Sequence, residues 1–164
     1  MKELLLQYAA YNVWANKLMI DAMQKLDATA LDQEIVSSFP SLRATVLHCW
    51  SAEYVWLQRL QLAEKPVWVQ NEFMGTFEEA NSEWQKVSAA LLQFVEKQYD
   101  DKALQHVLQF YDLKKESHKM PVYQVLQHVF NHCSYHRGQL VTMLRQVEVK
   151  EIPRTDFIVF ARKK

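Results

Sequence analysis

Three histidines towards the C-terminal end of the sequence have the spacing of a metal-binding helix. His128, His132 and His136 follow one another at intervals of four residues, and residues four apart lie on the same face of an α-helix. Neighbouring members of the series are about 6 Å apart along the helix axis, so one metal ion can bridge them. The first and third are about 12 Å apart, too far to share an ion. His132 therefore belongs to either possible pair.

The helical wheel indicates which neighbour joins His132. With His132 at zero and about 100° per residue, the apolar positions fill an arc from about 20° to about 100°, the face that points into the protein. His136 falls at about 40°, inside this arc, whereas His128 falls at about −40°, on its flank. Because a ligand in a helical core must point inward, we predict that His132 and His136 bind the metal and that His128 flanks the site.

A third ligand must come from another helix, and His48 is the best candidate. It lies in a strongly apolar segment, residues 42–57, where an unpaired imidazole would be costly to bury. Three histidines without a fourth protein ligand leave one position of the metal open for water or substrate, as in catalytic sites. Imidazole nitrogens suit Zn, Ni, Fe or Cu better than Mg or Ca. We expect Zn or Ni in this site, with Fe as a third option.

An ion with an open position can activate water for hydrolysis or bind a substrate thiolate. The helix of His132 has no carboxylate from residue 117 to residue 147, so it offers no general base. Cys133 stands where metalloproteases place the glutamate that follows their first histidine. The lack of a base favours thiol chemistry, or binding without catalysis, over hydrolysis. No catalytic residue can be assigned from the sequence.

Other residues near these histidines have different expected roles. Glu53 lies about 140° around the helix from His48, so we expect it to support the site from outside or to form an ion pair. Cys49 and Cys133 each follow a proposed ligand by one residue, a step of about 100°, and are predicted to be small core residues. Gly138 weakens its helix by about 1 kcal/mol, which we interpret as a sign that a neighbouring element approaches closely.

The composition favours one helical domain, residues 1–164. Only two glycines and four prolines occur in 164 residues, which is typical of long helices. Lys plus Arg equals Asp plus Glu, at 19 each, so no positive excess attracts nucleic acid. No segment has the length and apolarity of a membrane span, and residues 1–23 lack the features of a signal peptide. Since two cysteines without a disulfide framework fit a reducing compartment, we expect a cytoplasmic protein.

Hydrophobic periodicity predicts four long helices, over residues 2–26, 42–62, 77–98 and 121–147. Ser41 is expected to cap the second helix, and Thr76 and Glu79 form a capping box at the start of the third. Alternating apolar and polar residues around 104–117 predict a short β-hairpin before the last helix. Polar residues on the first helix are expected to make hydrogen bonds between helices: Tyr8, Asn12 and Asn16. The apolar end of the chain is predicted to pack across the helices or between subunits.

Features spread over nearly the whole chain resemble the DinB/YfiT-like family of metal-binding bundles. The most specific is the His-Arg-Gly-Gln run at residues 136–139. The others are Tyr11-Asn12-Val13-Trp14-Ala15-Asn16, Leu47-His48 followed by Glu53 and Trp56, His128-Val129-Phe130-Asn131-His132, and Pro153-Arg154-Thr155-Asp156. The resemblance implies an all-α fold, an antiparallel up-down four-helix bundle with a divalent metal on three histidines. By motif matching these are His48, His132 and His136.

The wider family resembles thiol-dependent S-transferases and isomerases as well as hydrolases. We therefore predict a metal-dependent enzyme, either an S-transferase or a hydrolase, acting on a small molecule with a low-molecular-weight thiol as a further partner. The alternative is a non-catalytic protein of the stress response, in which the metal stabilises the bundle or binds a ligand. A metal-free bundle that works through dimer contacts is the third hypothesis. The surplus of aromatic residues predicts a homodimer without indicating its interface.

Overall fold

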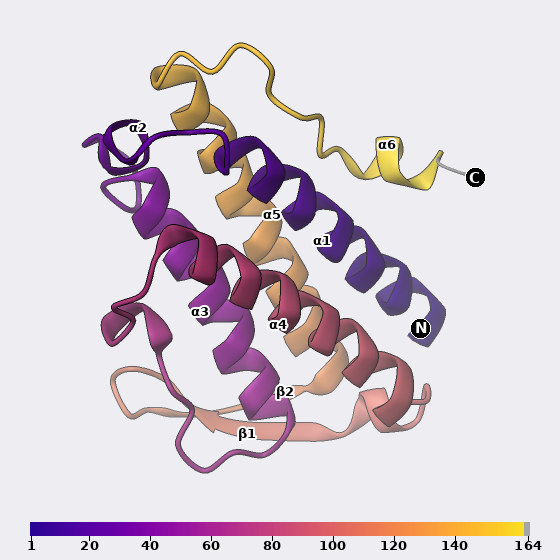
Figure 1. The fold of residues 1–164 in the computed structure, drawn as a ribbon. Coiled ribbons are helices and arrows are strands. Elements are labelled where there is room, and N and C mark those ends of the chain that lie inside the picture. Colours follow the sequence, from indigo (N-terminus) through magenta and orange to yellow (C-terminus); the bar gives the residue numbers. More distant parts are fainter. Residues whose placement is uncertain (163–164) are drawn as a thin grey trace.

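The structure is a computed structural model that describes residues 1–162, and its frame is four long helices with one β-hairpin (Figure 1). In chain order the elements are α1 (Lys2–Met23), α2 (Ala28–Asp32), α3 (Leu42–Leu60), the 3₁₀ helix η1 (Val69–Asn71), α4 (Phe77–Gln98), the 3₁₀ helix η2 (Ala103–Gln105), β1 (Val107–Tyr111), β2 (Ser117–Pro121), α5 (Val122–Gln146) and α6 (Phe157–Ala161). The prediction of a helical bundle with a hairpin before the last long helix is confirmed.

The four long helices form a ring in the order α1, α4, α3, α5. Helices α3 and α4 run in the same direction, since the guanidinium of Arg43 near the start of α3 lies 5.3 Å from the ring centre of Phe77 at the start of α4. The strict alternation of an up-down bundle therefore does not hold between these two helices. The connection at residues 61–76 reaches up to about 50 Å when extended, enough to return along α3, which is about 29 Å long, before α4 begins (Figure 1).

Local sequence signals account for where the elements begin. The Ser41 hydroxyl accepts a hydrogen bond from the backbone N–H of Ala44 and caps α3. The predicted capping box at α4 is present, with reciprocal side-chain bonds between Thr76 and Glu79. Strands β1 and β2 pair antiparallel, from Val107 opposite Pro121 to Tyr111 opposite Ser117. The hairpin closes the end of the bundle at which α3 and α4 finish and α5 begins (Figure 1).

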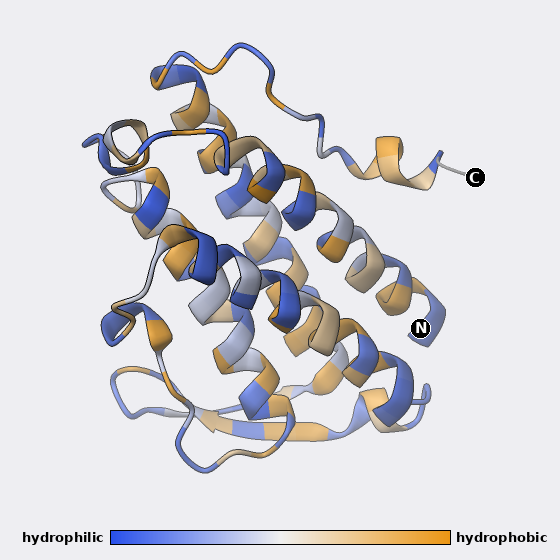
Figure 2. Ribbon diagram, viewed as in Figure 1, coloured by the Kyte–Doolittle hydropathy of each residue, from blue (hydrophilic) through white to orange (hydrophobic). Residues whose placement is uncertain are grey.

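All four long helices contribute to one apolar core. The buried large side chains include Met19 of α1, Leu42 of α3, Trp84 and Leu91 of α4, and Leu140 of α5. Full burial of a side chain of this kind contributes about 1.5–3 kcal/mol. Hydrophobic and hydrophilic residues alternate along each long helix (Figure 2), as expected of helices with one buried face. These core side chains come from α1, α3, α4 and α5 and are distinct from the histidines.

A buried carboxylate lies inside this apolar core. Glu53 of α3 has no exposed surface. Its Oε1 accepts hydrogen bonds from Asn16 Nδ2 at 2.6 Å, Trp84 Nε1 at 2.9 Å and Cys133 Sγ at 3.3 Å, and its Oε2 accepts one from Ser88 Oγ at 2.7 Å. The partners come from α1, α4 and α5, so this single carboxylate joins all four long helices.

The positive charge that balances this carboxylate is Arg137 of α5, which is also buried. Its Nη1 donates to Asn12 Oδ1 at 2.6 Å and Asn16 Oδ1 at 2.7 Å, and its Nη2 donates to Ser134 Oγ at 2.9 Å. The guanidinium also lies 5.1 Å from the ring centre of Tyr11. Asn16 Oδ1 accepts a hydrogen bond from Arg137, and Asn16 Nδ2 donates one to Glu53, so this amide connects the two charged groups. The expected interhelical role of the asparagines on α1 agrees with these bonds.

The end of the described chain packs on α1. The ring of Phe157 stacks on Tyr8 with 4.9 Å between centres and meets Tyr11 edge-on at 5.2 Å. The Tyr11 hydroxyl donates to the backbone carbonyl of Thr155 at 2.7 Å. Of the two placements expected for this apolar segment, packing within the chain is the one observed. Within residues 1–162, no helix combines the length and the apolarity needed to cross a membrane.

Candidate metal centre

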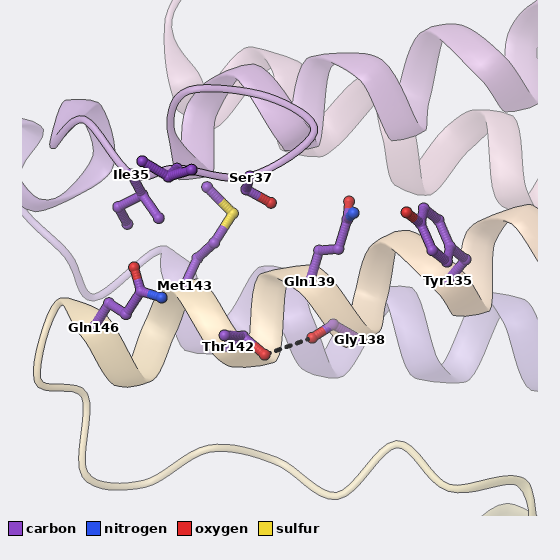
Figure 3. Close-up of a pocket in the computed structure, with 9 residues that line it drawn as sticks. Ile35, Ser37, Tyr135, Gly138, Gln139, Thr142, Met143 and Gln146 are labelled. Carbon is purple, nitrogen blue, oxygen red and sulfur yellow. Dashed lines mark hydrogen bonds between the residues drawn. The ribbon is translucent and has the colours of Figure 1, made fainter.

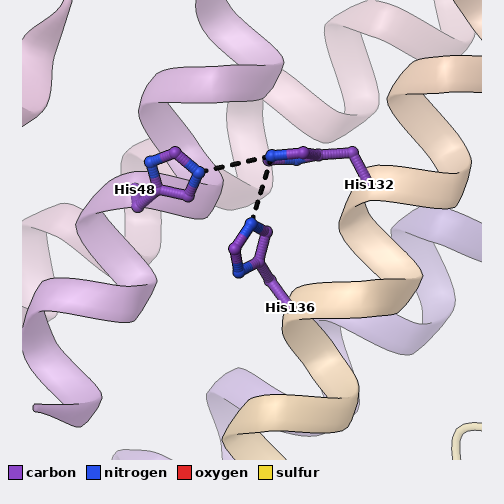
Figure 4. A group of neighbouring side chains, drawn as sticks. All are labelled: His48, His132 and His136. Atoms are coloured by element: carbon purple, nitrogen blue, oxygen red, sulfur yellow. Dashed lines mark hydrogen bonds between the residues drawn. The ribbon is translucent and has the colours of Figure 1, made fainter. Parts of the chain in front are cut away.

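The three predicted ligands meet between two antiparallel helices (Figure 4). His48 comes from α3, and His132 and His136 come from successive turns of α5. The Nε2 atom of His132 lies 3.3 Å from Nε2 of His48 and 3.1 Å from Nε2 of His136. One ring nitrogen of each histidine therefore points to a common position, and the three are close enough to hold one metal ion.

The distances between these nitrogens fit a transition metal. With metal–nitrogen bonds of about 2.0–2.1 Å and tetrahedral angles, two imidazole nitrogens on one ion are about 3.3 Å apart. The observed separations of 3.3 and 3.1 Å are close to this value. No cysteine or carboxylate of the described residues joins the group. Three protein ligands thus account for the site, which leaves a further coordination position for a non-protein ligand.

Two glutamines hold the rings in the orientation that a metal needs. His48 Nδ1 lies 2.9 Å from Gln70 Oε1, and His136 Nδ1 lies 2.8 Å from Gln139 Oε1. Since an amide oxygen can only accept, each Nδ1 carries the proton and donates it, and in a neutral imidazole Nε2 then has a free lone pair. Bonds of this kind fix the tautomer and raise the basicity of a metal-bound histidine.

Burial keeps the three imidazoles neutral. It lowers the pKa of His132 to about 3, with further lowering by the nearby charges that His136 and His48 would carry. Burial also lowers the pKa of His48 and of His136, against the opposing effect of their glutamine partners. Metal binding requires unprotonated imidazole. At neutral pH the site is therefore ready to bind an ion without first losing a proton.

Two loops close over the triad. The ring of Phe39, in the connection between α2 and α3, stacks on His48 with 4.1 Å between centres and lies 5.7 Å from His136. Ser38, which precedes Phe39 in the sequence, accepts a hydrogen bond of 2.6 Å at its Oγ from Gln139 Nε2. Gln70 belongs to η1 in the connection between α3 and α4. Elements that are far apart in sequence thus meet at this one site.

Residues predicted to lie beside the site do so without joining it. His128 is not part of the ligand group, and its ring centre is 5.7 Å from that of His132 and 5.2 Å from that of Trp56. Burial and the positive charge of Arg59 lower the pKa of His128. His128 also lines the end of an open groove of about 910 Å³ between the start of α1 and the start of α5. His128 therefore contacts both this groove and His132.

The two cysteines and Glu53 belong to the core. Cys49 and Cys133 are buried free thiols, and burial raises the pKa of both above the ordinary value. Glu53 makes its bonds to the interhelical network rather than to the triad. The prediction for the cysteines agrees with these positions, while Glu53 is neither a partner of the histidines nor one half of a direct ion pair.

The interpretation of Gly138 is wrong. We expected a neighbouring element to approach this glycine closely, but a Cβ added there would meet nothing within 4 Å. The residue is exposed on α5, and its backbone has no positive φ. Neither packing nor backbone conformation explains a glycine at this point of the helix.

A second group of side chains that could hold a metal ion lies at the turn of the hairpin. Asp112, Glu116 and His118 are close enough to hold an ion. Their contacts have a simpler explanation, because Asp112 Oδ1 accepts the backbone N–H groups of Lys114 and Glu116 and its Oδ2 lies 3.0 Å from His118 Nε2. These bonds shape the turn, so we assign the group no binding role.

The glutamines and Phe39 were not predicted from the sequence. Gln139 follows His136 by three residues on one helix, a spacing that brings side chains together, so a signal for it was available. Gln70 and Phe39 lie in connections without regular periodicity. Their positions depend on the path of each loop, which no spacing rule describes.

Known proteins resemble this chain over nearly its whole length. Residues 1–162 match the model of the DinB family. The protein DinB of Bacillus subtilis strain 168 is 30% identical over 156 residues, which cover 90% of this chain and 87% of that protein. A DinB-like protein from Bacillus cereus ATCC 10987 has a crystal structure with a TM-score of 0.72 at 23% identity, covering 92% of this chain and 94% of the other. A DinB-like protein from Bacillus subtilis, YjoA, has a TM-score of 0.67 at 15% identity, covering 92% and 98%. The chain belongs to the DinB family.

Proposed function

We propose that this protein is a metal-dependent enzyme in which His48, His132 and His136 hold one divalent transition metal ion. Zn or Ni is the expected ion, with Fe as the third option. The observation that carries the proposal is the convergence of three neutral Nε2 atoms at 3.1 and 3.3 Å. When bound, the ion would supply a Lewis acid with a position open to a small-molecule ligand.

Thiol-dependent S-transfer is the reaction class that the surroundings favour. A base beside the triad would assist hydrolysis by taking a proton from the attacking water, but Glu53 is committed to hydrogen bonds in the core, and no other carboxylate joins the histidines among the described residues. An ion held by His48, His132 and His136 would supply the Lewis acidity that lowers the pKa of a thiol, so S-transfer would not depend on such a base. Because Cys49 and Cys133 are buried, the reacting thiol must come from a separate low-molecular-weight molecule.

In the proposed transfer, the thiol loses its proton to solvent on binding. Its sulfur then forms a bond to an electrophilic carbon of the second substrate as the bond to the leaving group breaks, and the leaving group departs with that electron pair. The protein's part is to hold the imidazoles in one tautomer through Gln70 and Gln139. Phe39 covers two of the rings and excludes water from that side.

Cobalt provides a direct test of thiol binding. Protein loaded with Co²⁺ should develop a sulfur-to-cobalt charge-transfer band when 2-mercaptoethanol is added, and ethylene glycol, which lacks the sulfur, should leave the spectrum unchanged. The His132→Ala variant should show no band with either compound. Saturable absorption with the thiol alone would support S-transfer. An unchanged spectrum, combined with thiol-independent turnover of p-nitrophenyl acetate, would instead support the hydrolase.

The non-catalytic alternative predicts a different response to metal removal. If the ion mainly stabilises the bundle, chelation should unfold it, because the free energy of metal binding is then part of the free energy of folding. The large apolar core supports the opposite expectation, that the helices persist without metal. Far-UV circular dichroism before and after chelation distinguishes the two. Loss of helical signal on chelation would contradict the catalytic proposal.

We further infer a cytoplasmic homodimer that acts on small molecules rather than on nucleic acid. The net charge of zero offers no attraction for phosphates, and the free thiols fit a reducing compartment. Leu4 and Tyr8 leave 56% and 37% of their surface exposed on α1, and exposed apolar side chains of this kind are common at subunit contacts. Light scattering coupled to gel filtration would measure the mass, and a monomer at micromolar concentration would contradict the dimer.

A further inference from the structure

Neither packing nor backbone conformation accounts for the glycine at position 138. Gly138 lies in the middle of α5, where glycine is less favourable than alanine. A Cβ would meet nothing within 4 Å, so a larger residue could be accommodated and would strengthen the helix. No other residue among those described fills the space next to the Gly138 Cα.

This space is a cavity of about 320 Å³ between α5 and the connection that follows α2 (Figure 3). Residues 35–37 form one wall, and the opposite wall is the α5 surface from Tyr135 to Gln146. In Figure 3 the side chains of Gln139 and Met143 extend from α5 towards the loop that carries Ile35 and Ser37. A cavity of this size is at the lower end of the range for small-molecule sites.

The cavity shares a wall with the histidine triad. Gln139 lines it and, through Oε1, accepts the Nδ1–H of His136 at 2.8 Å. Tyr135 also lines it, and its ring centre is 5.0 Å from that of His136. A molecule in the cavity would thus be separated from the candidate metal position by Gln139 and the His136 ring.

The lining defines the chemistry of the ligand. None of the lining residues has a charged side chain, so the cavity offers no ion-pair partner to a charged group. Ile35 and Met143 provide apolar surface, and the amide of Gln146 can exchange hydrogen bonds with a ligand. The Gln139 amide is already bonded to His136 and Ser38, and the Thr142 hydroxyl donates to the Gly138 carbonyl, so each offers a ligand only its remaining lone pair or N–H. This combination fits a small, uncharged group with an apolar body and one carbonyl or amide.

We propose that the cavity binds an uncharged, non-reacting portion of the small-molecule substrate, and that Gly138 keeps it clear. The inference rests on the proposed function, because it places that portion of the substrate beside the metal centre. It also predicts that residues larger than glycine at this position stabilise the protein while they weaken ligand binding.

Benzamide, which is uncharged, apolar at one end and an amide at the other, is a suitable probe. In a titration of ¹⁵N-labelled metal-free protein followed by NMR, it should shift the Gly138 amide and the side-chain amides of Gln139 and Gln146 in a saturable way. Benzoate has the same shape with a negative charge and should bind at least about tenfold more weakly. Shifts confined to the groove between α1 and α5, or equal binding of benzoate, would overturn the inference.

Substitutions at Gly138 separate ligand clearance from stability. Gly138→Ala should raise the melting temperature by about 2–4 °C and weaken benzamide binding, and Gly138→Leu should weaken it at least about tenfold further. Gln93→Leu, at an exposed position of α4 outside both the cavity and the groove between α1 and α5, is the control and should bind benzamide as the wild type does. Wild-type benzamide binding by Gly138→Leu would contradict the proposal.

The metal content of each variant distinguishes the two proposals. Benzamide binding to metal-free protein that then fails to take up Zn²⁺ or Ni²⁺ would uphold the cavity as a binding site and remove its link to a metal reaction. Normal metal uptake without benzamide binding in either the metal-free or the loaded protein would overturn the cavity site alone.

Discussion

Two polar clusters lie close together on α3 and α5, and they differ in how their polar atoms are satisfied. The Glu53–Arg137 network has its charged groups bonded to side chains of other helices. In the histidine triad, the Nδ1 atoms of His48 and His136 are bonded, but the Nε2 atoms of all three rings converge on one another. The core network ties the helices together, although Arg137 Nε and Asn12 Nδ2 have no hydrogen-bond partner within residues 1–162, whereas the triad presents its three Nε2 atoms to one position that could hold an ion.

Neighbouring residues serve these different clusters because of helix geometry. His136 and Arg137 are adjacent in sequence, but a step of about 100° turns one towards α3 and the other towards α1. The same holds for His132, which faces the triad, and Cys133, which contacts Glu53. We therefore expect that each cluster can be changed without altering the other, and the following predictions test this separation.

The largest expected effect is loss of stability on removing the buried carboxylate. Glu53→Ala leaves Asn16, Trp84 and Ser88 without their acceptor and Arg137 without its balancing charge, which should cost about 3–5 kcal/mol of unfolding free energy. Glu53→Gln keeps the shape and should cost less. Urea unfolding in the presence of chelator measures both. A Glu53→Ala variant that lost metal binding but kept wild-type stability would show that the two clusters are not separate.

A smaller effect is expected from the glutamines that hold the triad. Gln139→Ala and Gln70→Ala should each weaken metal affinity by about 10- to 100-fold, because the rings lose the bond that fixes their tautomer. The stability of the metal-free protein should change little. Competition with a chromophoric chelator measures the affinity, and Gln127→Ala at an exposed site on α5 serves as the control. Affinity equal to that of the wild type in both variants would argue against a role for these bonds.

The smallest effect concerns the pH dependence of the metal-free protein. The pKa of His132 is lowered to about 3 from its ordinary value of 6.5. Between pH 6.5 and about pH 3, this side chain is protonated in the unfolded chain but neutral in the folded protein. The free energy of unfolding therefore falls as the pH drops below 6.5, and His132 does not affect it above pH 6.5. His132→Gln should flatten the slope of unfolding free energy against pH by up to about 1.4 kcal/mol per pH unit.

Urea unfolding at pH 7.5, 6.0 and 5.0 with chelator present would test this. Because His136, His48 and His128 interact electrostatically with His132, the difference between the wild type and His132→Gln reports the titration of His132 together with its coupling to these neighbours. Parallel stability curves for the two proteins would contradict a lowered pKa.

Local sequence patterns predicted the parts of the structure that depend on local geometry. The spacing of His132 and His136 on an apolar face indicated that both point inward, and they do. The capping box at Thr76 and the alternation before the last helix likewise specify their own structures. Such features need only the period of a helix or a strand.

Features that depend on chain path were not predictable. The common direction of α3 and α4 follows from the route of residues 61–76, and the placement of Gln70 beside His48 follows from the same route. The low helix propensity of Gly138 indicated a constraint other than helix stability at this position, but it did not indicate whether the adjoining space was filled or empty. Only the arrangement of the loop at residues 35–37 shows that it is empty.

Metal content tests the central claim most directly. Untagged wild-type protein and His132→Ala, prepared side by side and measured by plasma mass spectrometry, should contain about one transition metal ion per chain and none, respectively, with equal helical content. That result would establish that the convergent imidazoles form a metal site on a bundle that folds independently of it. A wild type that binds no metal after addition of Zn²⁺ or Ni²⁺, or a His132→Ala variant with the same metal content, would contradict the account.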